Sequence, residues 1–132
     1  MDQLTFNAWL TNKLSSYTFQ MHDATVDFFI AENKLNITPH CLSAIKDYYM
    51  TCMKLAAIAK DNGDEVSYLQ AIRKNYYCML SQIKGMTDDK ERTYVCSYAR
   101  LCLKMIYAHY ILNDEQKKAQ QFRSHFVVQM TK

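Results

Sequence analysis

Apolar residues recur at intervals of three and four along most of the chain, which is typical of helices that bury one face. The clearest stripe consists of Leu42, Ile45, Tyr49, Cys52, Ala56 and Ala59. Thr38-Pro39 precedes it, and Thr as N-cap with Pro in the first turn is a common helix start. Asn62-Gly63 follows it and is typical of a helix end. The pattern predicts a helix over residues 39–62.

The rest of the chain after Gly63 shows the same periodicity. Asp64 and Thr87 are expected as the N-caps of the next two helices, and Asn113 with Gln116 resembles a capping box before the last one. The stripe after Asp64 consists of Val66, Leu69, Ile72, Tyr76, Leu80 and Ile83. Helices are therefore expected over residues 65–84, 88–112 and 114–131.

The first 36 residues also form a helical pattern. Their stripe consists of Leu10, Leu14, Tyr17, Met21, Ala24, Phe28, Ala31 and Leu35. This stripe fits one long helix or two shorter ones, and Asp23 as an N-cap favours a break near His22-Asp23.

Short connections between long helices force consecutive helices to be antiparallel. The sequence therefore predicts an all-α protein, an antiparallel bundle of five or six helices in a single domain. Residues 1–36 form an N-terminal helical segment, residues 38–85 a first hairpin and residues 87–132 a second.

The two hairpins align weakly with each other at a shift of 50 positions, which suggests a repeated unit. In the first one, the leucine, small residues and turn of a tetratricopeptide repeat are matched by Leu55-Ala56, Ala59 and Gly63-Asp64. Residues 49–77 thus resemble such a repeat, although Tyr68 and Asn75 stand where that family keeps small residues. The resemblance implies a helical scaffold that binds peptides or proteins.

Composition supports this architecture and places the protein in the cytoplasm. Hydrophobic residues make up 49% of the chain, while Gly 2 and Pro 1 leave few residues for tight turns. The five cysteines are odd in number and form no C-x-x-C, and MDQLTFNAWL does not resemble a signal peptide. The longest apolar stretch contains Arg100 and Lys104, which argues against a membrane span.

Motifs of catalysis or metal binding are not found in the sequence. With Gly63 and Gly85 as the only glycines, phosphate-binding loops and dinucleotide fingerprints are excluded. No two histidines are four residues apart, and no pair of cysteines has zinc-site spacing. We therefore expect a protein that is not an enzyme and that needs no metal and no cofactor.

Charge and tyrosine content point instead to a binding surface. After Glu65 the acidic residues lie only at helix starts, so the helix bodies carry only Lys and Arg. In the pairs Tyr48-Tyr49 and Tyr76-Tyr77, one ring is expected in the core and the other at its edge, where tyrosine favours protein interfaces. The predicted partner contacts are Tyr49, Arg73, Tyr77, Arg100 and Lys104.

These features predict a small non-enzymatic protein–protein interaction module, such as an adaptor, chaperone or inhibitor. Its partner would be another protein or a peptide, bound through the aromatic and basic helical surface. A homodimer stays open as a further use of such a surface. The alternative is a nucleic-acid-binding regulator that uses the basic helix faces.

Overall fold

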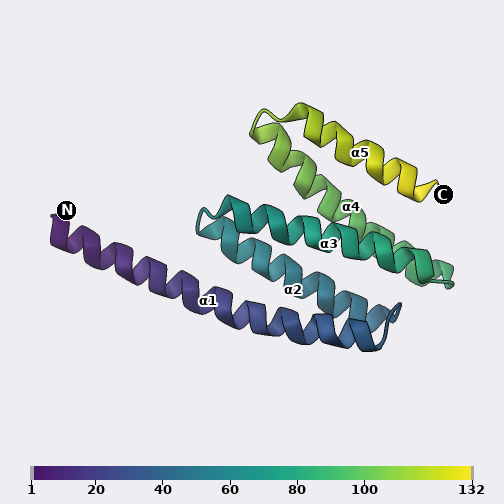
Figure 1. Ribbon diagram of the computed structural model, residues 1–132, viewed down its shortest axis with the longest axis horizontal. Coiled ribbons are helices and arrows are strands. Elements are labelled where there is room, and N and C mark those ends of the chain that lie inside the picture. The colour runs from purple at the N-terminus through teal and green to yellow at the C-terminus, as the bar shows by residue number, and fades with distance from the viewer. Residues whose placement is uncertain (1, 132) are drawn as a thin grey trace.

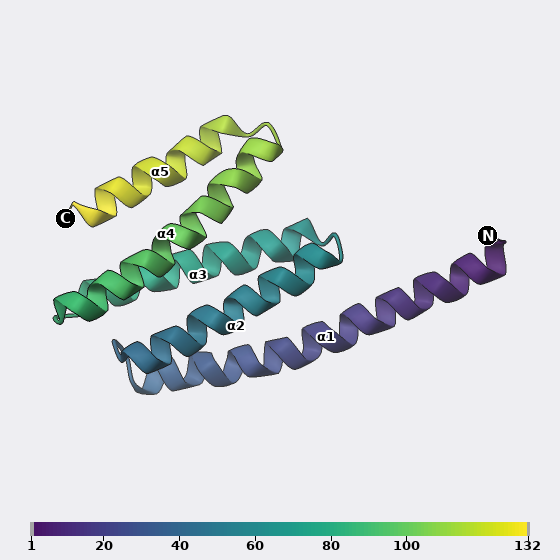
Figure 2. The same cartoon turned by 180° about the vertical axis from the view of Figure 1, so that it is seen from behind.

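The computed structural model describes residues 2–131, which form five helices. These are α1 (Gln3–Ile37), α2 (Leu42–Asp61), α3 (Glu65–Gly85), α4 (Asp89–Leu112) and α5 (Gln116–Met130). Each helix packs against the next one, and α2 also contacts α4. Figures 1 and 2 show that consecutive helices run antiparallel and that α1, α3 and α5 form one layer while α2 and α4 form the other. The prediction of an all-α antiparallel bundle is confirmed.

The core is centred on α3, which packs between α2 and α4. Its fully buried side chains include Ile45, Ile72, Tyr76, Met79, Val95 and Ile106. The predicted stripe of α3 is wrong at its start, because Val66 is 69% exposed whereas Tyr68 and Asn75 are buried. Because α3 contacts helices on two sides, its buried band lies away from Val66. The buried Asn75 side chain donates from Nδ2 to the Tyr49 carbonyl at 3.2 Å, while its Oδ1 has no partner among the described residues.

Helix α1 runs without interruption through 35 residues, so the predicted break near His22-Asp23 is wrong. No Pro or Gly lies in this segment to break it, and Asp23 is an exposed residue within the helix. The second half packs on α2 through Ala24, Phe28, Ala31 and Leu35. The first half extends beyond the α2–α3 turn (Figure 1), and residues 2–16 are all exposed.

The corner between α1 and α2 differs from the prediction of a helix start at Thr38-Pro39. Thr38 is the C-cap of α1, with its backbone N–H bonded to the Lys34 carbonyl, and α2 begins at Leu42. His40 takes a positive φ of 63°, and its backbone N–H donates to Gln82 Oε1 at 2.8 Å. This contact with α3 stabilises the non-helical turn at residues 38–41. Local sequence preferences do not reveal it, because Gln82 is distant in the chain.

Two other predicted caps are also shifted. Asp88 rather than Thr87 caps α4, and its side chain accepts from the Glu91 backbone N–H at 2.9 Å. Asn113 ends α4 as its C-cap instead of starting α5, whose N-cap is Glu115 with no side-chain cap bond. The Asp64 cap of α3 is confirmed by its bond from the Ser67 N–H.

The α2–α3 and α4–α5 turns have the same backbone geometry. The residue after each C-cap is left-handed, namely Gly63 with φ 73° and Asp114 with φ 57°. The next N–H closes the turn onto the helix, from Asp64 to Ala59 at 2.9 Å and from Glu115 to Tyr110 at 2.8 Å. Both turns are Schellman motifs, in which glycine is the favoured residue at the left-handed position.

Exchanging the residues at the left-handed positions should change stability in opposite directions. We expect Asp114→Gly to raise the free energy of unfolding by about 0.5–1 kcal/mol, because glycine has no Cβ penalty at positive φ. Gly63→Asp should lower it by a similar amount for the same reason. Urea unfolding of both variants beside the unmodified protein measures the two shifts, and equal signs would contradict the argument.

Candidate protein-binding surface between α3 and α5

An aromatic cluster joins α3 to α5. The rings of Tyr76 and Tyr77 on α3 lie 5.8 Å and 6.2 Å from the Phe122 ring on α5. His125, one turn further along α5, has its ring 5.8 Å from that of Tyr77 in an edge-on arrangement. Such edge and tilted pairs stabilise beyond the area they bury, so the cluster fixes the relative position of the two helices.

Tyr76 anchors this cluster from inside the core. Its side chain is fully buried, and burial raises the pKa of its phenol, which stays protonated at neutral pH. The hydroxyl oxygen lies 2.9 Å from His125 Nδ1. When the phenol donates to Nδ1, the imidazole carries its proton on Nε2 and can offer it as a donor elsewhere.

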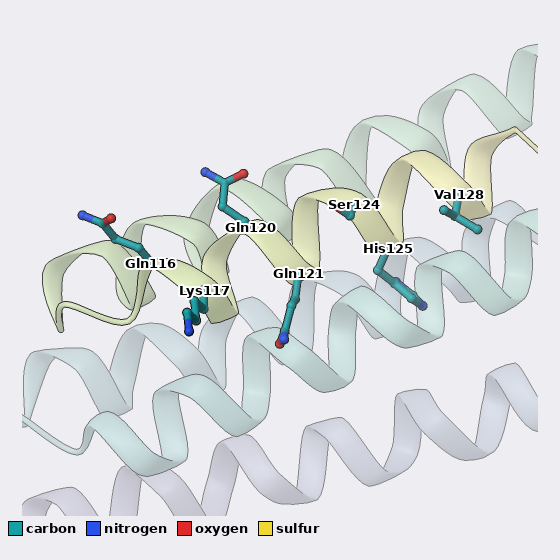
Figure 3. A pocket seen from close by; sticks show the side chains of 7 residues that line it. All are labelled: Gln116, Lys117, Gln120, Gln121, Ser124, His125 and Val128. Atoms are coloured by element: carbon teal, nitrogen blue, oxygen red, sulfur yellow. The ribbon is translucent and has the colours of Figure 1, made fainter.

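Two shallow hollows lie on the surface of these two helices. One of about 400 Å³ is lined by α3 alone and one of about 700 Å³ by α5 alone, and the edge-on contact of Tyr77 with His125 connects the two linings. In Figure 3, Gln121 and His125 point toward α3, whereas Gln116 and Gln120 point the other way. We call this surface the α3–α5 trough, and its residues are Val66, Leu69, Gln70, Arg73, Tyr77, Lys117, Gln121, His125 and Val128.

The charge of the α3–α5 trough is positive. Arg73 and Lys117 lie in it, and no described Asp or Glu lines either hollow. The guanidinium carbon of Arg73 sits 5.5 Å from the centre of the Phe122 ring, a cation–π contact that orients it. Tyr77 is 45% exposed beside it. The trough therefore combines cations, an accessible aromatic ring and amide side chains.

The five residues predicted as partner contacts fall into separate places. Arg73 and Tyr77 come together in the trough. Tyr49 is half-buried and stacks on Tyr98 of α4, with ring centres 4.3 Å apart. Arg100 and Lys104 are exposed on α4, in the other layer, and no ion pair with a residue of 2–131 involves either of them.

Sequence reasoning missed the α5 half of this surface. Phe122 lies within the last predicted helix, but its contact with Arg73 and Tyr77 joins residues nearly fifty positions apart in the chain. No motif or regular spacing in the sequence marks His125 or Lys117 as a binding residue. Only the packing of α5 beside α3 brings them to the same surface.

Neither metal chemistry nor a membrane span is indicated among the described residues. Within residues 2–131, no three His, Cys, Asp or Glu side chains gather closely enough to hold a metal ion. None of the five helices there combines the length and apolar character that crossing a bilayer requires. Comparisons with protein-family models, curated proteins and solved structures found no match for this chain, so the tetratricopeptide-like character of residues 49–77 stays a prediction.

Proposed function

We propose that this protein is a small non-enzymatic protein–protein interaction module, and that its α3–α5 trough binds an acidic segment of a partner protein. The observation that carries the proposal is the lining of the trough, which has two cations and, among the described residues, no carboxylate. Opposite charge speeds association and selects the partner. Tyrosine and arginine are also the residues most enriched where interfaces are buried.

The side chains around the cations suit a peptide chain. Gln70 and Gln121 offer both donors and acceptors, which can pair with the backbone N–H and C=O groups of an extended segment. Tyr77 offers apolar area with a polar tip, so it can pack on a side chain of the partner and still hydrogen-bond. An acidic segment with at least one apolar side chain fits these groups best.

A nucleic-acid-binding regulator is less well supported. Tracking a phosphate backbone requires a continuous row of cations, but Arg73 lies on α3 while Arg100 and Lys104 lie on α4 in the opposite layer. Several other lysines are already engaged, since Lys34, Lys54 and Lys74 each pair with an acidic residue. The basic residues are therefore divided between surfaces.

Charge reversal in the trough tests the proposal. Arg73→Glu with Lys117→Glu should reduce capture of the natural partner, in affinity purification with mass spectrometry, by at least about tenfold. Two attractive contacts become repulsive, and about 1.4 kcal/mol already corresponds to a tenfold change. Binding of a fluorescent glutamate-rich peptide should fall in parallel and should weaken as salt is added.

The matched control carries the same charge change on α4, as Arg100→Glu with Lys104→Glu. It should keep the partner and the peptide, because these residues lie outside the trough. Equal loss in both double variants would contradict the trough as the binding surface. The nucleic-acid alternative would be favoured by a different set of results. The unmodified protein would bind a random oligonucleotide, both double variants would lose this binding, and affinity purification would capture no protein.

A further inference from the structure

The outer face of α1 carries an apolar stripe that no other part of residues 2–131 covers. Its residues are Phe19, Val26, Ile30 and Ile37, which are 68%, 44%, 64% and 72% exposed. They lie on the side of the helix opposite to Ala24, Phe28, Ala31 and Leu35, which pack on α2. We call these four exposed residues the outer stripe.

Helix α1 is apolar on two opposite sides, one of which meets α2. Val26 and Ile30 adjoin each other in the outer stripe. Asp23 lies between Phe19 and Val26, and Lys34 lies between Ile30 and Ile37. Exposed apolar surface of more than roughly a few hundred Å² marks an interaction site.

The spacing of the outer stripe shows which occupant fits it. The intervals are seven, four and seven residues, so the stripe is symmetric about residue 28. A two-fold axis places the same patch of two copies against itself. With α1 antiparallel to α1 of a second copy, Phe19 falls opposite Ile37 and Val26 falls opposite Ile30, so each apolar residue meets an apolar residue.

Charges beside the outer stripe agree with the same pairing. Asp23 and Lys34 are eleven residues apart, so they flank the stripe on the same side. In an antiparallel two-fold pair, equal flanks face each other, which brings Asp23 of one copy next to Lys34 of the other. Lys34 also pairs with Asp47 of its own chain at 2.7 Å, and both side chains are half exposed, so it can serve both carboxylates.

The available area also matches that of a specific dimer. Phe29, beside the stripe, is 60% exposed and Phe19 in it is 68% exposed. At about 150–250 Å² for a whole aromatic side chain, these two alone leave roughly 200–300 Å² of apolar surface per chain, to which the three aliphatic residues of the outer stripe add. A standard interface buries about 800 Å² per partner, of which somewhat more than half is apolar. The outer face of α1 is therefore large enough.

We propose that the protein forms a two-fold homodimer in which the outer stripes of two α1 helices pack antiparallel, centred on residue 28. The surface lies on α1, whereas the α3–α5 trough lies on α3 and α5. Dimerisation therefore leaves the trough free for a partner, and each of the two proposals can fail without the other.

Complementary charge variants test the pairing of Val26 with Ile30. In sedimentation velocity over a concentration series, the unmodified protein should move from the mass of one chain to that of two. Val26→Glu and Ile30→Lys should each raise the dimer dissociation constant at least tenfold. Mixing these two variants should restore dimers, because the introduced glutamate of one chain then meets the introduced lysine of the other. At the symmetry-related position, the unmodified Val26 and Ile30 still meet each other.

The control for these variants is Val127→Glu, which alters an exposed valine on α5 and should leave dimerisation unchanged. Circular dichroism should show that all the variants keep their helices, because the altered side chains are exposed. A protein that stays monomeric at every concentration would overturn the proposal. So would dimers that Val26→Glu and Ile30→Lys leave intact.

Cross-linking tests the register independently. In a Cys41→Ser background, which removes the exposed native thiol, Asp23→Cys and Lys34→Cys place thiols on the same flank of the outer stripe, at the two positions that the pairing brings together. A mixture of the two variants should form disulfide-linked heterodimers under mild oxidation. Each variant alone should not, because its two thiols are separated by about 15 Å or more along the helix axis. Cross-linking of each variant alone, without preference for the mixture, would overturn the register.

Discussion

Ile72→Ala should lower the free energy of unfolding by about 2–5 kcal/mol. Ile72 is fully buried in α3, the helix that packs against both α2 and α4. Removing its side-chain atoms forfeits their burial and leaves a cavity that close-packed neighbours fill only partly. Since a domain of this size is stable by about 5–15 kcal/mol, the variant should unfold at a much lower urea concentration.

Val66→Ala is the matched control for this substitution. It removes side-chain atoms from the same helix, but Val66 is 69% exposed, so the change in stability should stay within about 0.5 kcal/mol. Equal losses from both variants would show that α3 does not pack as described. Urea unfolding followed by the circular dichroism of the helices measures both, and an unchanged slope keeps the comparison valid.

Alkaline pH should unfold the protein, beginning above about pH 9. Burial raises the pKa of the Cys52 and Cys102 thiols from 9.0 to about 12, and that of Cys78 to about 11. Burial also raises the pKa of the Tyr48 and Tyr76 phenols. In the unfolded chain these groups lose their protons at ordinary pKa values, whereas the folded protein keeps them protonated.

The sign of this dependence follows from proton binding. Above about pH 9 the unfolded state binds fewer protons than the folded state, so stability falls as pH rises toward the folded-state pKa values. Each thiol contributes at most about 1.4 kcal/mol per pH unit. Cys52 and Cys102 together should therefore cost roughly 5 kcal/mol by about pH 11, and below about pH 8 they should contribute no slope.

Thermal unfolding between about pH 7 and about pH 11 tests this prediction. Cys102→Ala should be less stable at neutral pH but should lose stability less steeply in alkali, because one buried thiol is gone. Cys41→Ser should keep the full slope, since Cys41 is exposed. A melting temperature that stays constant from about pH 8 to about pH 10.5 would contradict the burial of these thiols.

The α3–α5 trough and the outer stripe of α1 illustrate two kinds of sequence information. Arg73 and Tyr77 were predictable as neighbours on one helix face because they lie four residues apart, and their relative position needs only the helical period. Lys117 and His125 were not, because their place beside α3 depends on how α5 packs. The outer stripe is periodic in the sequence, but its exposure depends on which side of α1 faces α2.

The local sequence was sufficient to predict the all-helical class, the helix end at Gly63 and the Asp64 cap, since these depend on neighbours a few residues away. It failed at the α1–α2 corner, where the contact between His40 and Gln82 overrides the preference of Thr38-Pro39 for a helix start. Thus the sequence by itself determined that the chain forms long antiparallel helices, because periodicity and caps are local. Only the tertiary structure decided which faces are buried and which surfaces stay exposed, because burial depends on packing between distant segments.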